Sequence, residues 1–178
     1  INDLRFESIH VVNVVNDAKD SRLPQEVDSP RNGTTRLLKI RFTTRVDLAK
    51  FAKRTEFNIG SEVTICNSRD GKPVQVGGGR IYQTGVQVGM YPVESSDSAT
   101  SHQAIRSPIH RSYDVYASIK QSQASAGATF SPAFDVSASP ADLCLRLSGG
   151  DMRGATFTSN VIVIKQQDLT RALGSWKK

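Results

Sequence analysis

The sequence lacks long hydrophobic runs and is poor in the residues that bind metals. No apolar stretch approaches the roughly 20 residues that a membrane-spanning helix needs, so we expect no transmembrane segment. There are two cysteines and three histidines, and their positions match no zinc-binding spacing. The sequence therefore indicates no metal site and no cofactor.

The length and uniform composition of the chain fit a single domain. Its 178 residues are 38% hydrophobic and 22% charged, a balance typical of a globular domain rather than a disordered segment. A chain of this length can bury a sizeable core. With no internal repeat and no clear boundary, we expect one domain over residues 1–178, of which 174–178 form a loose tail.

Short segments of alternating polarity make up most of the chain. In 36–46, the residues Leu38, Ile40 and Phe42 fall on one face, and charged residues lie between them. Strict alternation indicates a strand with one buried face and one solvated face. Comparable strand patterns occur at 4–15, 62–67, 80–91, 112–121, 134–137, 141–148 and 156–165.

Helices are expected at two places. Asp47 can cap a short helix that ends near residue 54, and 168–173 can form a last helical turn. Strands do not alternate regularly with helices, which argues against a parallel α/β sheet. We therefore predict an all-β fold. Its expected form is a two-sheet antiparallel β-sandwich, immunoglobulin-like or jelly-roll-like, with one or two short helices, and an open barrel is the alternative.

Glycine and small polar residues mark the connections. Turns are expected at 32–33, 70–71 and 149–151, and long loops at 16–32, 94–108 and 121–129. The three glycines at 77–79 are expected to interrupt any regular element. They do not match a phosphate-binding loop, because no Lys-Ser/Thr pair stands in register at a helix start.

The two cysteines, Cys66 and Cys144, each lie in an apolar stretch with strand character. A disulfide between them could bridge two sheets, as in exported sandwiches. Two unrelated buried thiols are the alternative, but we favour the disulfide. The chain begins with Ile1 rather than Met, which agrees with a removed signal peptide or with a trimmed sequence, and we favour the signal peptide. We therefore expect an exported protein, periplasmic or secreted.

No residue pattern selects a catalytic group. His10, His102 and His110 have no Ser and Asp partners at a defined spacing, and there is no Gly-x-Ser-x-Gly motif. Paired carboxylates could hydrolyse a glycosidic bond. No context distinguishes the candidates, which are Glu56, Glu62, Asp135 and Asp142. We therefore assign no catalytic residue.

Positive charge is concentrated in one window. Residues 36–54 contain one acid and seven bases, which are Arg36, Lys39, Arg41, Arg45, Lys50, Lys53 and Arg54. The strand and helix patterns predict that they form one basic face, able to dock an acidic protein or an anionic glycan or lipid surface. Protection of an edge strand is the alternative interpretation. Nucleic acid is not expected as a partner, because the window offers no aromatic stacking platform.

Together these features favour a non-catalytic binding protein of the bacterial envelope or periplasm. One form would be an inhibitor or immunity-type protein that covers an acidic partner with its basic face. The first alternative is an exported hydrolase that acts on a polysaccharide or peptide. The second is a structural or adhesive subunit that assembles through an added or exchanged strand.

Overall fold

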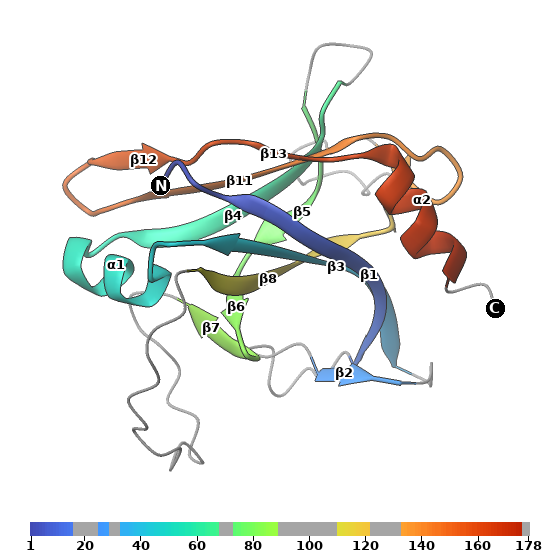
Figure 1. Ribbon diagram of the computed structural model, residues 1–178, viewed down its shortest axis with the longest axis horizontal. Coiled ribbons are helices and arrows are strands. Elements are labelled where there is room, and N and C mark those ends of the chain that lie inside the picture. Colours follow the sequence, from blue (N-terminus) through green and yellow to red (C-terminus); the bar gives the residue numbers. More distant parts are fainter. Residues whose placement is uncertain (16–24, 29–32, 68–72, 89–109, 122–132, 176–178) are drawn as a thin grey trace, which may run out of the picture.

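A computed structural model describes residues 1–15, 25–28, 33–67, 73–88, 110–121 and 133–175. Within these residues the chain forms thirteen strands and two helices (Figure 1). The expected loop at 94–108, the turn at 70–71 and most of the expected loops at 16–32 and 121–129 lie outside the described residues.

The strands are β1 Arg5–Val15, β2 Gln25–Val27, β3 Thr34–Thr44, β4 Asn58–Ile65, β5 Val74–Gly79, β6 Ile81–Gln83, β7 Val86–Val88, β8 Arg111–Ser118, β9 Lys120–Gln121, β10 Phe134–Asp135, β11 Leu143–Gly150, β12 Thr156–Thr158 and β13 Ile162–Ile164. The helices are α1 Leu48–Thr55 and α2 Gln166–Ser175.

Antiparallel pairing organises the whole fold. Eleven strands form one large sheet with the order β12-β11-β4-β5-β8-β3-β1-β2. Strand β13 also pairs with β11, β6 pairs with β8, and β7 pairs with β6. Strands β9 and β10 form a second, two-stranded sheet. The predicted all-β antiparallel class is confirmed, and the division into the two facing sheets of a sandwich stays a prediction.

The large sheet curls so that its first strand lies beside its last. Asn160, between β12 and β13, accepts a hydrogen bond from the Leu4 N–H (3.0 Å) and donates one to the Leu4 carbonyl (3.1 Å). Its own N–H donates to the carbonyl of Ile1 (3.3 Å). These bonds join the N-terminal segment to the β12–β13 edge, and β1 also contacts β13 (Figure 1).

The alternation in the sequence defines the core. In β3, Leu38, Ile40 and Phe42 are fully buried, as predicted. The leucines of β11 at 143, 145 and 147 are also fully buried and belong to the same cluster. Each such side chain contributes roughly 1.5–3 kcal/mol relative to an exposed one.

The expected interruption at residues 77–79 is wrong, because β5 continues through all three glycines. A Cβ at Gly77 would overlap the backbone of Ala117 on β8, and one at Gly78 would overlap the carbonyl of Ser61 on β4. Gly78 also has a φ of +126°. The glycines therefore let β5 pass close to both neighbours, and their lack of a side chain supports this strand.

Several element boundaries also differ from the sequence prediction. The expected strand at 80–91 is a hairpin of β6 and β7, turned at Thr84 and Gly85, which both have positive φ. Gly149 and Gly150 end β11 and the turn follows them. Residues 156–165 form two strands, and the loop 16–32 contains β2. Helix α2 is longer than one turn and includes the first two residues of the expected tail.

Helix α1 begins as predicted. The side chain of Asp47 accepts a hydrogen bond from the N–H of Lys50 (3.0 Å) and caps the helix. The hydroxyl of Tyr113 on β8 accepts a second bond from the Leu48 N–H (3.0 Å). Two of the free N–H groups at the helix start are therefore satisfied, and α1 is tied to the large sheet.

Asp3 ties the chain start to the end of β3. It accepts hydrogen bonds from the Thr44 hydroxyl (2.6 Å), the Arg45 N–H (2.8 Å) and the Arg45 Nε (3.1 Å). Burial alone would raise the pKa of Asp3, but these bonds outweigh it and lower the pKa from 3.8 to about 2.

We expect the stability that Asp3 contributes to be complete above about pH 4 and to be lost as the pH falls through about 2. The sign follows because the unfolded chain takes up the proton at a higher pH than the folded protein does. Urea unfolding of the natural protein and of Asp3→Asn between about pH 5 and pH 2 measures this. The difference in free energy of unfolding should shrink toward the acid end, and a constant difference would contradict the assignment.

Candidate functional site

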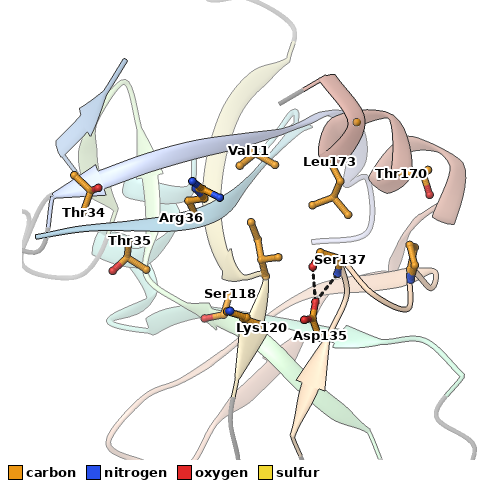
Figure 2. A pocket seen from close by; sticks show the side chains of 13 residues that line it. Val11, Thr34, Thr35, Arg36, Ser118, Lys120, Asp135, Ser137, Thr170 and Leu173 are labelled. Carbon is orange, nitrogen blue, oxygen red and sulfur yellow. Dashed lines mark hydrogen bonds between the residues drawn. The ribbon is translucent and has the colours of Figure 1, made fainter. Parts of the chain in front are cut away.

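A cavity of about 620 Å³ lies between α2 and the strand ends beside it. Its apolar wall includes Val11 from β1, Ile119 between β8 and β9, and Leu173 from α2. Figure 2 shows Val11 and Leu173 directed toward this space. The wall combines the first third, the middle and the end of the chain, so the cavity exists only in the folded protein.

Polar side chains line the rest of the cavity. Five hydroxyl groups take part, those of Thr34, Thr35, Ser118, Ser137 and Thr170. Three charged residues complete the set, Arg36 from β3, Lys120 from β9 and Asp135 from β10 (Figure 2). Among the described lining residues, these are two cations and one carboxylate, and Arg36 already has a partner within the protein.

Asp135 is engaged in its own turn. Its Oδ1 accepts hydrogen bonds from the Ser137 hydroxyl (2.5 Å), the Ser137 N–H (2.9 Å) and the Ala138 N–H (3.1 Å). The bond from the Ser137 hydroxyl is the main cause of a lowered Asp135 pKa, and the charge of Lys120, its partner across the β9–β10 pair, lowers it further. The carboxylate is therefore ionised at neutral pH and is not a proton donor.

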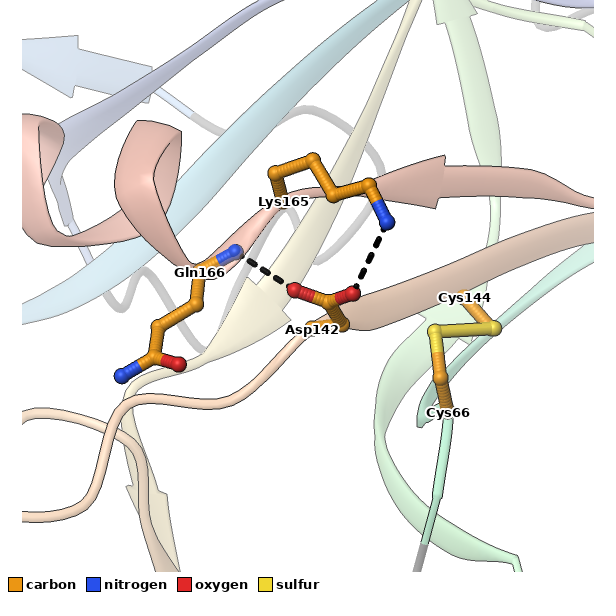
Figure 3. The surroundings of a disulfide bond; sticks show 5 residues. All are labelled: Cys66, Asp142, Cys144, Lys165 and Gln166. Carbon is orange, nitrogen blue, oxygen red and sulfur yellow. Dashed lines mark hydrogen bonds and ion pairs between the residues drawn. A yellow bond between two sulfur atoms is a disulfide. The ribbon is translucent and has the colours of Figure 1, made fainter.

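Asp142 places α2 against the cavity. Its Oδ1 accepts the N–H of Gln166 at the helix start (2.7 Å), and its Oδ2 pairs with the Lys165 Nζ (3.2 Å) (Figure 3). The hydrogen bond from Gln166 is the main cause of a lowered Asp142 pKa. The buried residues Leu169 and Ala172 hold the helix to the core, which brings Leu173 to the cavity.

The predicted disulfide between Cys66 and Cys144 is confirmed, with a Cα–Cα distance of 5.0 Å. Cys144 lies in β11 and Cys66 directly follows β4, so the bond joins neighbouring strands of the large sheet rather than two separate sheets. The N–H of Cys66 also donates to the carbonyl of Asp142 (3.0 Å). The disulfide therefore lies next to the residue that holds the start of α2 (Figure 3).

The structure distributes the seven basic residues of the window over three places. Arg36 lines the cavity. Lys39 and Arg41 lie on the face of β3 opposite its buried residues, and the exposed Arg45 directly follows the strand. Lys50, Lys53 and Arg54 are exposed on α1.

The three cations on the β3 side are paired with carboxylates. Lys39 contacts Glu26 (2.7 Å) and Asp114 (3.5 Å), and Arg41 binds Asp114 through two nitrogens (2.8 and 3.1 Å). Arg45 pairs with Asp3. Asp114 comes from β8 and Glu26 from β2. Both acids therefore lie outside residues 36–54, the window from which the basic face was predicted. This part of the surface is therefore close to neutral.

Glu26 also receives a hydrogen bond from the hydroxyl of Tyr116 (2.6 Å). Burial, and then this bond to a carboxylate, raise the pKa of Tyr116 far above its ordinary value. The ring of Tyr82 packs edge-on against that of Tyr116 (5.5 Å). These contacts connect β8 to β2 and to the β6–β7 hairpin.

The candidate catalytic carboxylates lie mostly in surface ion pairs. Glu56, Glu62 and Asp142 pair with cations, and Asp135 is the one carboxylate among the described cavity residues. His10 is exposed on β1, His110 is half-buried, and His102 lies outside the described residues. In the part of the chain that the structure describes, no three His, Cys, Asp or Glu side chains could hold a metal ion.

Neither of the described helices is long and apolar enough to cross a membrane. Comparisons of the chain with protein-family models, with curated proteins and with solved structures return no match. The function therefore has to be inferred from the shape and charge of the molecule itself.

Proposed function

We propose that this chain is a non-catalytic binding protein that holds a small amphipathic ligand in the cavity beside α2. The observation that carries the proposal is the cavity itself. Its volume of about 620 Å³ falls within the roughly 300–1,000 Å³ that is usual for ligand sites. An apolar wall with a few polar groups on one side is also typical of such sites.

The charge of the lining selects the ligand chemistry. Lys120 is exposed and stands opposite Asp135, whose Oδ1 is already occupied by its own turn. Arg36 lies on the β3 side of the same lining but already has a partner within the protein, so Lys120 is the cation on which the inference depends. We infer a ligand with an apolar body and a single acidic group, a carboxylate or a phosphate. The described lining residues place no second carboxylate or histidine beside Asp135, which supports binding rather than hydrolysis.

The matched probes octanoate and 1-octanol test this proposal by isothermal titration calorimetry. Leu173→Trp should fill the cavity and weaken the binding of both probes at least about tenfold, because the larger side chain occupies the space that the probe needs. Gln167→Trp adds the same side chain to an exposed position of α2 outside the cavity lining and should leave both affinities unchanged.

A variant of Lys120 tests recognition of the acidic group of the ligand. Lys120→Gln should weaken octanoate about tenfold and leave 1-octanol unchanged, since a hydrogen bond to a charged group is lost only for the acid. Equal effects of Leu173→Trp and Gln167→Trp would rule out the cavity as the site. Equal effects of Lys120→Gln on both probes would rule out recognition of the acidic group.

Export to the envelope or periplasm is part of the same proposal. The disulfide supports it, because such bonds persist in oxidising compartments and are rare in the cytosol. A sandwich-like scaffold is also inferred, since the buried side chains of β3 and β11 share one core cluster. This arrangement would place the two halves of the curled sheet face to face.

The acidic partner expected from the sequence remains a second proposal. What supports it is the exposure of Lys50, Lys53 and Arg54 on α1. An inhibitor or immunity-type role would use this helix rather than β3, because the β3 cations already bind carboxylates. The hydrolase and the structural or adhesive subunit are kept as alternatives, but no observation favours either over a binding protein.

A further inference from the structure

Helix α1 and the turn between β11 and β12 lie at the end of the molecule away from α2 (Figure 1). They carry several exposed cations and an exposed methionine. We call this surface the α1 tip. It consists of Lys50, Lys53 and Arg54 on α1, together with Met152 and Arg153 in the turn between β11 and β12. It is separate from the cavity, so the inference below does not depend on the ligand proposed there.

Contacts join the helix and the turn into one surface. Arg153 pairs with Glu56, the residue that ends α1 (3.2 Å). Beneath them, Phe157 of β12 packs edge-on against Phe51 of α1 (5.4 Å) and stacks on Phe57 (5.7 Å). The turn therefore has a defined position relative to the helix.

The exposure of Met152 is unusual for an apolar side chain. Its relative accessibility is 101%, and only Val161 and Val163 are other large hydrophobic residues exposed in the described part of the chain. The turn beneath it is ordered by Asp151, which accepts hydrogen bonds from the N–H groups of Arg153 and Ala155 (3.0 and 2.8 Å). Met152 thus projects from a held turn, with no partner among the described residues.

The α1 tip carries an excess of positive charge. Five bases stand against three acids at the tip and its margin, an excess of two: Lys50, Lys53, Arg54, Arg111 and Arg153 against Asp47, Glu56 and Asp151. Asp47 is occupied by the helix cap and by Arg111 (3.4 Å), and Glu56 by Arg153. No ion pair involves Lys53 or Arg54 within the described residues, and Lys50 lies 3.9 Å from Asp47 with 83% of its side chain exposed.

We propose that the α1 tip docks onto an anionic lipid surface. The cations contact the lipid phosphates, and Met152 enters the boundary between headgroups and acyl chains. An anionic surface attracts each nearby Lys or Arg, and the apolar interior provides the burial that Met152 lacks in the protein. A glycan would satisfy the cations but not the methionine, and this combination favours a membrane over an anionic polysaccharide.

Sedimentation with vesicles tests the proposal. The probes are vesicles of equal parts phosphatidylglycerol and phosphatidylcholine, and vesicles of phosphatidylcholine alone. The natural protein should bind the anionic vesicles and not the neutral ones. Binding should weaken steeply between about 50 and about 500 mM salt, because exposed charges are screened. Equal binding to both vesicles, or none to either, would overturn the proposal.

Two variants locate the surface. Lys50→Gln/Lys53→Gln/Arg54→Gln should weaken vesicle binding about 100-fold, since each cation near an anionic bilayer contributes roughly a fivefold factor. Met152→Ser should weaken it about fivefold, for partial burial of one apolar side chain. All four positions are exposed in the folded protein, and an unchanged unfolding midpoint would confirm that each variant folds.

A matched control removes three cations elsewhere. Arg5→Gln/Lys165→Gln/Arg171→Gln changes the net charge by the same amount at exposed positions outside the tip, and it should retain vesicle binding within a few fold. Equal losses in the two triple variants would assign the effect to net charge and refute the tip. Binding to immobilised heparin through Lys50, Lys53 and Arg54, without vesicle binding, would replace the lipid surface by an anionic glycan.

Discussion

Loss of the Cys66–Cys144 disulfide is expected to lower the free energy of unfolding by about 4 kcal/mol. The bond joins residues 78 positions apart. In the chain-entropy model, closing so long a loop strongly restricts the unfolded chain. For a domain of this size, about 4 kcal/mol corresponds to a fall in the unfolding temperature of roughly 8–16 °C.

Thermal and urea unfolding with and without a reductant measure this effect. The double variant Cys66→Ala/Cys144→Ala is the control, because it should match the reduced natural protein and should not respond to the reductant. A reduced protein that keeps its full stability would show that the bond contributes little. Hydrogen exchange should show the loss early in α2, because Asp142 holds both Cys66 and the helix start.

Asp114→Ala is expected to lower the free energy of unfolding by about 2 kcal/mol, less than for a fully buried ion pair because the Arg41 side chain is 40% exposed. The side chain of Asp114 is only 9% exposed and binds both Lys39 and Arg41. Without it, Arg41 loses its carboxylate and Lys39, 18% exposed, keeps only Glu26. Asp114→Asn retains an acceptor and should cost less.

Glu62→Ala is the matched control for this experiment. Glu62 pairs with Arg146 across β4 and β11 (2.6 Å), but both side chains reach solvent, and the loss should stay below about 1 kcal/mol. Urea unfolding at neutral pH compares the three variants. Similar losses for Asp114→Ala and Glu62→Ala would show that the ion pairs of Asp114 are as well solvated as a surface pair.

Local patterns predicted the elements whose causes are local. The alternation in β3 and β11 identified their buried faces, because successive side chains of a strand point to opposite sides. Asp47 marked the start of α1, because its carboxylate satisfies a backbone group three residues away. The disulfide could also be predicted, since only two cysteines are present and both lie in strand-like segments.

Predictions failed or remained incomplete where the cause is distant in the chain. The sequence of residues 77–79 predicts an interruption of regular secondary structure. Gly77 and Gly78 are instead required within β5, because Ala117 and Ser61 lie too close for a side chain. The basic window suggested one continuous positive face, but the structure neutralises its β3 part with acids from other strands. The alternation of its strand predicts that Asp114 points outward, so an acid that could neutralise a basic residue was visible in the sequence. No local pattern indicates that this acid lies opposite Arg41.

The candidate cavity likewise depends on segments that are distant from one another in the chain. Its residues come from β1, β3, the region from β8 to β10, and α2, and none of these segments carries a binding motif by itself. A cavity depends on where several walls meet, and that position follows from strand order and helix docking. Sequence periodicity carries no information on either.

By itself, the amino-acid sequence determined an antiparallel strand-rich domain, the buried faces of its main strands, the start of α1 and the identity of the disulfide. The first three properties depend on residue spacing and on short-range hydrogen bonds, and the disulfide follows because only two cysteines are present. The tertiary structure alone decided which strands are neighbours, which charges neutralise one another, and where a cavity and an exposed methionine remain. These properties depend on contacts between segments far apart in the chain, and they carry the proposed functions.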